Sequence, residues 1–141
     1  MAIKIYRGEI EVRTSREGDI VNLEKYLVEH LAKSGINNGV LHLFVTGSTA
    51  ALTTIEYESG LREDLMNSLE RIAPRDAEYK HHLRWGDDNG HSHVRASIIG
   101  PSISIPVENG RPLLGTWQQV VLVELDTRPR SRKIVTTIIG E

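Results

Sequence analysis

The densest group of potentially reactive side chains lies in residues 81–100. This stretch holds four of the six histidines, two adjacent aspartates, an asparagine and two arginines. Imidazole and carboxylate groups together can bind a metal ion, move a proton or hold a phosphate. Histidine is normally a rare residue, so its clustering favours a functional site over the alternative, a solvated loop whose aspartates cap a helix.

The segment 46–49, which reads Thr-Gly-Ser-Thr, could bind an anion. Hydroxyl residues after a glycine can hold a phosphate through backbone N–H groups and their own O–H groups. Ser48 and Thr49 are therefore candidate ligand-binding residues, although the segment taken alone favours a simple kink or bulge between strands. It is not a P-loop, because the lysine and the required spacing are absent.

A basic turn over residues 126–132 contains three arginines. Guanidinium groups bind phosphates and carboxylates through paired hydrogen bonds, so Arg130 and Arg132 are candidate ligand-binding residues. Two alternatives carry similar weight: the turn is simply solvated, or it pairs with acidic residues of a neighbouring subunit.

The periodicity of the apolar residues predicts the elements that position these groups. Apolar or alternating runs predict strands over residues 3–14, 40–45, 50–57, 102–107, 113–125 and 133–139. Three- and four-residue spacing predicts helices over 59–72, 89–99 and, with Asp19 as its cap, 19–35. Asn109 and Gly110 fit a hairpin turn. The pattern is typical of an α+β domain with hairpin strand connections.

Composition restricts the class of protein. The 141 residues include 39% apolar and 26% charged residues, which is ordinary for one soluble domain over residues 1–141. The net charge of -2 argues against nucleic-acid binding, which usually needs a basic surface. Cysteine, a signal-peptide pattern and a membrane-length apolar run are all absent, so we expect a cytoplasmic protein without membrane partners.

Several segments together carry a resemblance to a known family: His81 and residues 87–97, 100–102, 105–107, 114–118 and 132–141. With these segments the chain resembles the YjbQ family, a widespread set of small proteins often labelled secondary thiamine-phosphate synthase. The resemblance covers nearly the whole chain. It implies an α+β fold, with antiparallel sheets arranged like a β-sandwich and two main helices packed at the side. It also implies a homotrimer and a pocket lined by the histidine stretch near a subunit boundary.

The family label implies the joining of a pyrimidine diphosphate to a thiazole phosphate, with loss of pyrophosphate. Dedicated thiamine-phosphate synthases are (β/α)₈ barrels, and such a barrel needs roughly 200 residues or more. We therefore expect any synthase activity of this chain to be weak.

The resemblance also bears on a metal site. Members of the family commonly carry a histidine at the position of Gly47, and many lack one at the position of His91. We infer that His91 replaces the missing ligand, so His81, His91 and His93 are the candidate set for a divalent metal such as zinc. His91 and His93 are two residues apart, so they share a face in an extended segment and diverge on a helix. The alternative is that the histidines bind an anion directly.

The first function hypothesis is an enzyme that acts on a phosphorylated small molecule. Asp88 or His93 would be the acid or base, and Glu56 would orient a histidine from outside. Arg95 would join the metal and the basic turn in neutralising phosphate charge as a leaving group departs. The assigned ligand contacts are Ser48, Thr49, Asn89, Gln118, Arg130 and Arg132.

The second hypothesis is a non-catalytic, trimeric protein that binds a metabolite or phosphate. The density of titratable groups favours the enzyme, because binding alone rarely needs so many together. In either case Trp117 is expected to pack in the core, and Gln118 to face the opposite side and reach the site.

Overall fold

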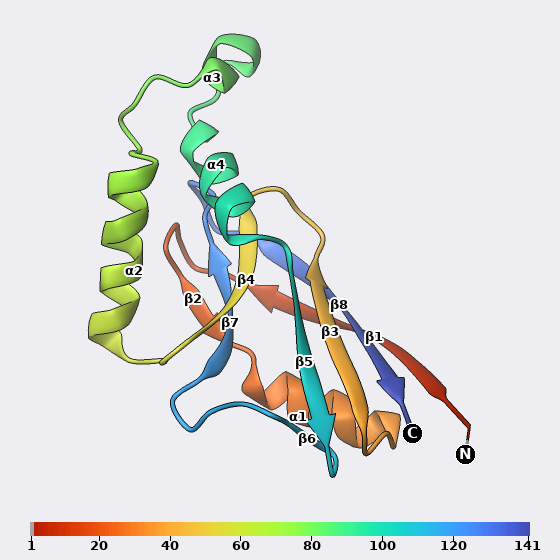
Figure 1. Cartoon of the computed structure of the whole chain (residues 1–141). Coiled ribbons are helices and arrows are strands. Elements are labelled where there is room, and N and C mark those ends of the chain that lie inside the picture. The colour runs from red at the N-terminus through yellow and green to blue at the C-terminus, as the bar shows by residue number, and fades with distance from the viewer. Residues whose placement is uncertain (1) are drawn as a thin grey trace.

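Two antiparallel sheets make up most of the chain, of which the computed structural model describes residues 2–141 (Figure 1). The larger sheet contains, in spatial order, β1 (Lys4–Arg13), β8 (Ser131–Gly140), β3 (Gly39–Val45), β5 (Ser102–Glu108) and β6 (Arg111–Pro112). The smaller sheet contains β2 (Ile20–Asn22), β7 (Gln119–Glu124) and β4 (Ala50–Ile55). The antiparallel sheets and accompanying helices confirm the predicted α+β class.

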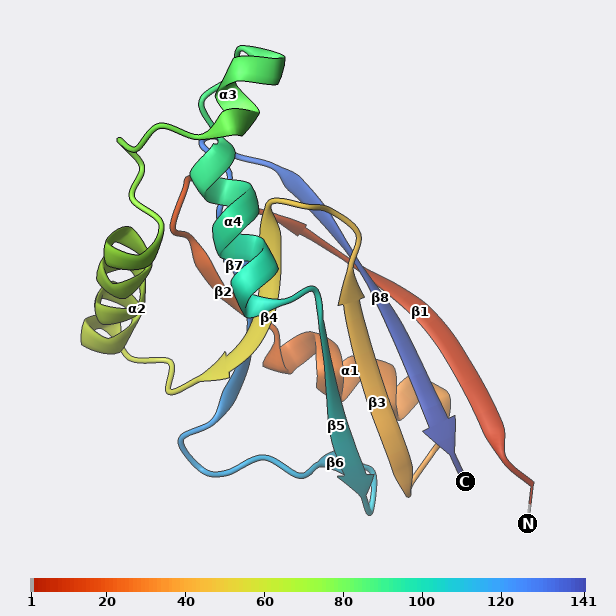
Figure 2. The same cartoon turned by 45° about the horizontal axis from the view of Figure 1, so that its top comes forward.

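Helices lie on two sides of this framework (Figure 2). They are α1 (Glu24–Ser34), α2 (Ser59–Ile72), α3 (Lys80–Trp85) and α4 (Gly90–Ile99). α1 crosses one face of the larger sheet, whereas α2 and α4 lie beside the smaller sheet. Within residues 2–141, no helix is both long and apolar enough to cross a membrane.

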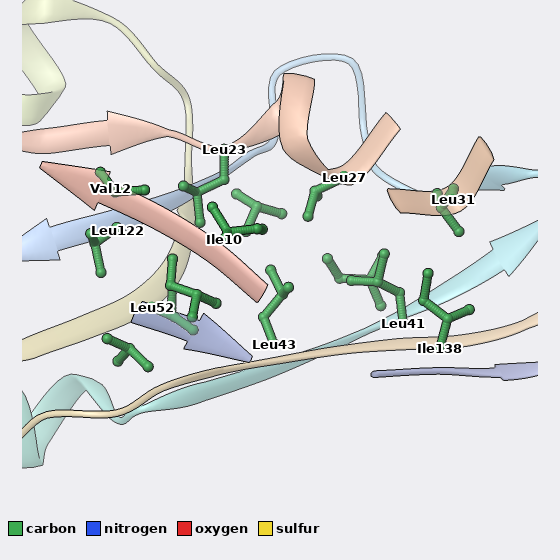
Figure 3. Packing of buried hydrophobic residues seen from close by; sticks show 14 of the residues in the cluster. Ile10, Val12, Leu23, Leu27, Leu31, Leu41, Leu43, Leu52, Leu122 and Ile138 are labelled. Atoms are coloured by element: carbon green, nitrogen blue, oxygen red, sulfur yellow. The ribbon is translucent and has the colours of Figure 1, made fainter. Parts of the chain in front are cut away.

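The main core fills the space between the two sheets and α1 (Figure 3). Alternate strand residues point inward and meet the apolar stripe of α1. The buried members include Ile10, Leu27, Leu31, Leu41, Leu43, Leu52, Leu122 and Ile138. Each such side chain contributes roughly 1.5–3 kcal/mol by leaving water, so this core is a stable support for the loops at its edge.

A second core fixes α2 and α4 against the other face of the smaller sheet. Its buried members are Ile20, Ala51, Leu69, Ala96, Val121, Val123 and Leu125. Because Ala96 is small, α4 can approach β4 closely, and the polar residues at the start of α4 are held at the end of the sheet.

The outer face of the larger sheet is open to solvent. Strand register places Ile5, Ile139, Val40 and Pro106 in one row across β1, β8, β3 and β5. All four side chains are exposed. An apolar row of this kind on an uncovered sheet face is a candidate surface for contact with another chain.

Several local predictions are confirmed. Gly35 ends α1 in the left-handed conformation with φ of 66°. The hairpin turn has φ of 52° at Asn109 and 75° at Gly110. The predicted helix over 59–72 is present with those bounds, and Pro74 follows it.

The predicted start of the first helix at Asp19 is wrong. Residues Ile20–Asn22 instead form β2, which pairs with β7, and the helix begins at Glu24 after Asn22 Oδ1 accepts its backbone N–H. Asp19 closes the preceding turn by accepting the N–H and O–H of Ser15. The spacing of Ile20 also fits a helix, but pairing with a distant strand determined its conformation.

The predicted core position of Trp117 is also wrong. The strand expected over 113–125 covers only Gln119–Glu124, and the residues between β6 and β7 form a loop. Trp117 lies on this loop with 73% of its surface exposed. Two smaller differences are that the strand expected to reach residue 57 ends at Ile55, and that the segment 74–88 contains α3.

Candidate functional site

The candidate site lies where α4 begins, beside the loop before β4 and the turn between β7 and β8. The pairing of Ala50 with Glu124 brings the start of β4 next to the end of β7. A hydrogen bond from the N–H of Thr46 to the carbonyl oxygen of Lys133 attaches the same loop to β8. Segments far apart in the sequence therefore meet at one end of the smaller sheet.

A pair of histidines, His81 of α3 and His93 of α4, faces this point. Their ring centroids are 4.6 Å apart. His81 Nδ1 lies 3.1 Å from Asp87 Oδ1, and the two form an ion pair when the imidazole is protonated. Burial lowers the pKa of His93 below its ordinary value, and the adjacent His81 lowers it further. His93 is therefore neutral near pH 7, with one ring nitrogen able to accept a proton.

Asp126 joins the turn, the loop and the start of α4. Its Oδ2 accepts hydrogen bonds from Thr49 Oγ1 at 3.1 Å and Arg130 Nε at 2.9 Å, and its Oδ1 accepts one from Asn89 Nδ2 at 3.3 Å. Burial raises the pKa of Asp126, but hydrogen bonds from the Thr127 N–H, Arg130 and Asn89 outweigh burial and lower it to about 2. Asp126 is thus an ionised anchor rather than a proton donor.

A buried ion pair between Arg132 and Glu124 lies next to Asp126. Arg132 Nε donates to Glu124 Oε1 at 2.9 Å, and Nη2 donates to Glu124 Oε2. The same Nη2 donates to Thr49 Oγ1 at 2.8 Å and to the Thr49 carbonyl oxygen at 3.1 Å. The pair therefore sets the conformation of the loop before β4.

A small cavity opens beside these groups. Its volume is about 170 Å³. It is lined by Gly47, Ser48, Ala50, His93, Ala96, Ser97 and Pro101. Hydroxyl groups and one neutral imidazole thus face a space that a small polar group can enter.

Most of the predicted ligand contacts meet at this site. Those that the structure brings together are Ser48, Thr49, Asn89, Arg130, Arg132, His81 and His93. Asp88 lies on the exposed loop between α3 and α4, directly before Asn89. Thr49, Arg130 and Arg132 contact protein carboxylates or one another, so much of their hydrogen-bonding capacity is used within the chain.

Arg95 and His91 lie on the opposite side of α4. Arg95 is 2% exposed; its Nε donates to the Ala73 carbonyl oxygen at 3.0 Å and its Nη2 to Glu70 Oε2 at 2.6 Å. His91 is fully buried, and its Nε2 lies 3.1 Å from Glu17 Oε1. The structure therefore does not place Arg95 or His91 in the candidate site.

The three-histidine metal set is not assembled in this chain. His91 and His93 are both helical, so they point to different sides of α4, as the two-residue spacing requires on a helix. Over residues 2–141, no three His, Cys, Asp or Glu side chains lie close enough to hold a metal ion together. The donor set of a single chain thus does not fit a three-ligand zinc site.

Glu56 and Gln118 lie at the other end of the smaller sheet. β4 and β7 pair from Ala50 with Glu124 at the site to Ile55 with Gln119 at the far end, a span of about 17 Å. Gln118 Nε2 donates to Thr54 Oγ1 at that end. Within one chain, neither residue reaches the histidine pair.

Asp126 and Glu124 are central to the site, and the sequence analysis did not single them out. Both carboxylates stand at the end of an apolar strand and are followed closely by the arginines of the turn. A charged residue inside or directly after a buried strand needs a partner. Acidic residues at the end of an apolar strand, followed closely by arginines, could therefore have predicted these ion pairs.

A larger cavity of about 610 Å³ lies elsewhere, between α1 and the loop before β7. Its lining is mostly apolar or neutral, and Glu24 and Arg111 are its charged residues. Proton transfer and phosphate binding need ionisable or hydrogen-bonding groups that converge, so the smaller cavity beside His93 is the stronger candidate for chemistry.

Comparison with known proteins places these features in a family. The UPF0047 YjbQ-like family matches residues 8–141. A UPF0047 protein from Methanothermobacter thermautotrophicus is 39% identical over 139 residues, which cover 99% of this chain and 95% of that protein. The UPF0047 protein YjbQ from Salmonella typhimurium is 36% identical over 107 residues, which cover 75% of this chain and 77% of that protein.

Solved structures agree in fold. A YbjQ-like protein of unknown function from Sulfolobus solfataricus P2 has a TM-score of 0.94 at 37% identity, covering 99% of this chain and 100% of that chain. A hypothetical protein from Aeropyrum pernix K1 has a TM-score of 0.88 at 34% identity, covering 96% of this chain and 99% of that chain. With matches in sequence and fold over nearly its whole length, the chain belongs to the UPF0047 YjbQ-like family.

Proposed function

We propose that this protein is an enzyme that acts on a phosphorylated small molecule in the cavity beside His93. The observation that carries the proposal is the pair formed by His81 and His93, with ring centroids 4.6 Å apart, in which His93 lines a cavity together with Ser48 and Ser97. Two imidazoles in different surroundings, one near a carboxylate and one kept neutral, are suited to move a proton between them and a ligand.

In this proposal His93 is the general base. Its lowered pKa keeps it neutral near pH 7, the state in which an imidazole accepts a proton. His81 Nδ1 lies 3.1 Å from Asp87 Oδ1, so this carboxylate can orient the second imidazole beside His93. Asp126 and Asn89 hold the start of α4 in place and do not react.

The resemblance to secondary thiamine-phosphate synthases motivates one specific reaction for the proposal. A thiazole phosphate would displace pyrophosphate from a pyrimidine diphosphate, with the pyrophosphate leaving with its electron pair. Asp126 and Glu124 neutralise the two arginines nearest the cavity, which leaves little net positive charge for a departing pyrophosphate. We accordingly propose this transfer as a weak activity of the site.

A divalent metal such as zinc remains a prediction from the sequence. Elemental analysis of protein prepared without a histidine tag or added metal tests it. A stoichiometric metal that a chelator removes, with loss of thermal stability, would support the metal. Absence of such a metal would leave direct anion binding by the histidines.

A second candidate is a non-catalytic binder of the same class of ligand. The observation that favours it is the pairing of Arg130 and Arg132 with protein carboxylates, because an electrophilic site usually presents free cationic groups. This hypothesis predicts binding of phosphorylated metabolites without turnover.

The test is turnover of a panel of phosphorylated metabolites, including the synthase substrate pair, measured beside thermal shift with the same compounds. The matched variants are His93→Gln at the site and His42→Gln on the outer face of β3. The enzyme proposal expects turnover that His93→Gln abolishes and His42→Gln preserves. Thermal shifts without turnover in the unmodified protein would favour the binder instead.

The proposal includes a homotrimer. Its support is apolar surface on the single chain. Trp117 is 73% exposed, Leu113 on the same loop and Val28 of α1 are also exposed, and the apolar row on the larger sheet is open. A second copy that covers the Trp117 loop would bury this surface. Light scattering should give a trimer mass for the unmodified protein and a lower mass for Trp117→Ser. A monomer mass for the unmodified protein at micromolar concentration would contradict the trimer.

A further inference from the structure

The absence of a side chain at Gly47 leaves a gap directly beside the Arg132 guanidinium. A Cβ atom added at Gly47 would lie 3.0 Å from Arg132 Nη1, the sole close contact that it would make outside its chain neighbours. Gly47 does not adopt a positive φ, so the backbone there does not require glycine. The glycine, which itself lines the cavity, instead leaves Nη1 uncovered on its side.

Nη1 is the nitrogen of this guanidinium for which residues 2–141 provide no acceptor. Nε donates to Glu124, and Nη2 donates to Glu124 and Thr49. The Arg132 side chain is only 7% exposed, but Nη1 is not among the polar side-chain atoms of residues 2–141 that are buried without a partner. Its N–H groups therefore face solvent and can donate to an acceptor that comes from outside the chain.

The cavity that Gly47 and Ser48 line is also the one that His93 faces. Its volume of about 170 Å³ is well below the roughly 300–1,000 Å³ of pockets that enclose a whole small molecule. One small group of a ligand fits inside, while the remainder lies outside the cavity. A rigid guanidinium edge and a hydroxyl group are donors suited to an oxyanion.

We propose that the phosphoryl group of the ligand binds in this cavity, on Arg132 Nη1 and the Ser48 hydroxyl, and that Gly47 keeps the position open. The inference rests on the proposed function and specifies which part of the ligand the site recognises. Because Glu124 and Asp126 balance the charges of Arg132 and Arg130, recognition depends on hydrogen-bond geometry more than on net charge.

Titration of inorganic phosphate into the full ¹⁵N-labelled chain, followed by the backbone amide resonances of residues 46–49, tests the site directly. The unmodified protein should show saturable shifts of these amides at millimolar phosphate. Gly47→Ala should weaken the affinity about tenfold, the effect of losing one hydrogen bond from a charged group. Ser48→Ala, which removes an exposed hydroxyl, should weaken it by a smaller factor.

Gly115→Ala is the matched control. A Cβ at Gly115 would lie 3.6 Å from Gln118, an ordinary contact, and far from the site, so its phosphate affinity should equal that of the unmodified protein. Equal affinity in Gly47→Ala, or phosphate shifts that never include residues 46–49, would overturn the inference. If acetate shifted the amide resonances of residues 46–49 with the same affinity as phosphate, the assignment of the site to a phosphoryl group would be overturned.

The inference and the proposed function can fail separately. If no phosphorylated compound is turned over but Gly47→Ala still weakens phosphate binding, the anion site stands and the enzyme proposal fails. If turnover depends on His93 but Gly47→Ala changes neither KM nor phosphate affinity, the enzyme proposal stands and the anion site fails.

Discussion

The two sides of α4 use the same residue types for different purposes. On the closed side, His91 and Arg95 are buried and bonded to Glu17, Glu70 and the backbone of Ala73. On the open side, His93 faces His81 and a cavity. A histidine or arginine that is buried and paired with protein carboxylates can stabilise the fold but is closed to a ligand. A group with free hydrogen-bonding capacity beside a cavity is the one to test for chemistry.

The largest effect is expected on activity from the open side. His93→Gln should lower kcat/KM for a turned-over phosphorylated substrate by about 10²–10⁴, the usual contribution of a general base. Because Gln keeps the size and polarity of the position, the free energy of unfolding should change little. Steady-state kinetics measure kcat/KM and urea unfolding measures the free energy of unfolding. If His93→Gln lowered both strongly, His93 would act on stability as the closed side does, and the two sides would not differ.

On the closed side the largest effect is expected on stability. Arg95→Leu removes a hydrogen bond to a carboxylate and another to a buried carbonyl oxygen, so it should lower the free energy of unfolding by about 2–4 kcal/mol. The half-exposed Glu70 is rehydrated once its partner is lost, which limits the loss. Urea unfolding gives the value, and phosphate affinity of the folded variant should be unchanged. A selective loss of phosphate binding would place Arg95 in the site after all.

Asp126 should link stability to acid pH. Its folded pKa of about 2 is below the ordinary 3.8, so its ionised form stabilises the folded state above pH 3.8, and this contribution disappears as pH falls toward 2. The difference amounts to roughly 2 kcal/mol. Unfolding at pH 6 should therefore show Asp126→Asn as less stable by about this amount, with the gap closing near pH 2. If the difference in unfolding free energy between the two proteins did not change with pH, Asp126 would contribute through its shape and not through its charge.

The smallest effect is expected from the buried histidine of α4. His91→Gln keeps a donor for Glu17 in a buried position, so it should cost only about 1 kcal/mol of stability. It should leave kcat/KM and phosphate affinity within about twofold, in contrast to His93→Gln. The same kinetics and unfolding measurements apply. A large loss of activity in His91→Gln would contradict the assignment of His91 to the closed side.

Local sequence was sufficient for most elements. The spacing of Leu61, Leu65 and Leu69 predicted α2, and the Asn109-Gly110 pair predicted the hairpin, because helix period and turn conformation depend on neighbouring residues alone. The family motifs also pointed to the correct family, and the clustered histidines pointed to the region of the candidate site. The spacing of His91 and His93 already implied that a helix would separate them.

Tertiary structure decided which of these groups faces a cavity. Ile20 pairs with β7 despite fitting a helical stripe, and Trp117 lies on a loop surface. Arg132 meets Thr49, 83 residues away, and Glu124. Residue types and spacing determine what a side chain can do, whereas its partners come from segments joined only by folding. For that reason the sequence predicted the histidines and arginines of the site, and only the fold distinguished the open imidazole of His93 from the closed one of His91.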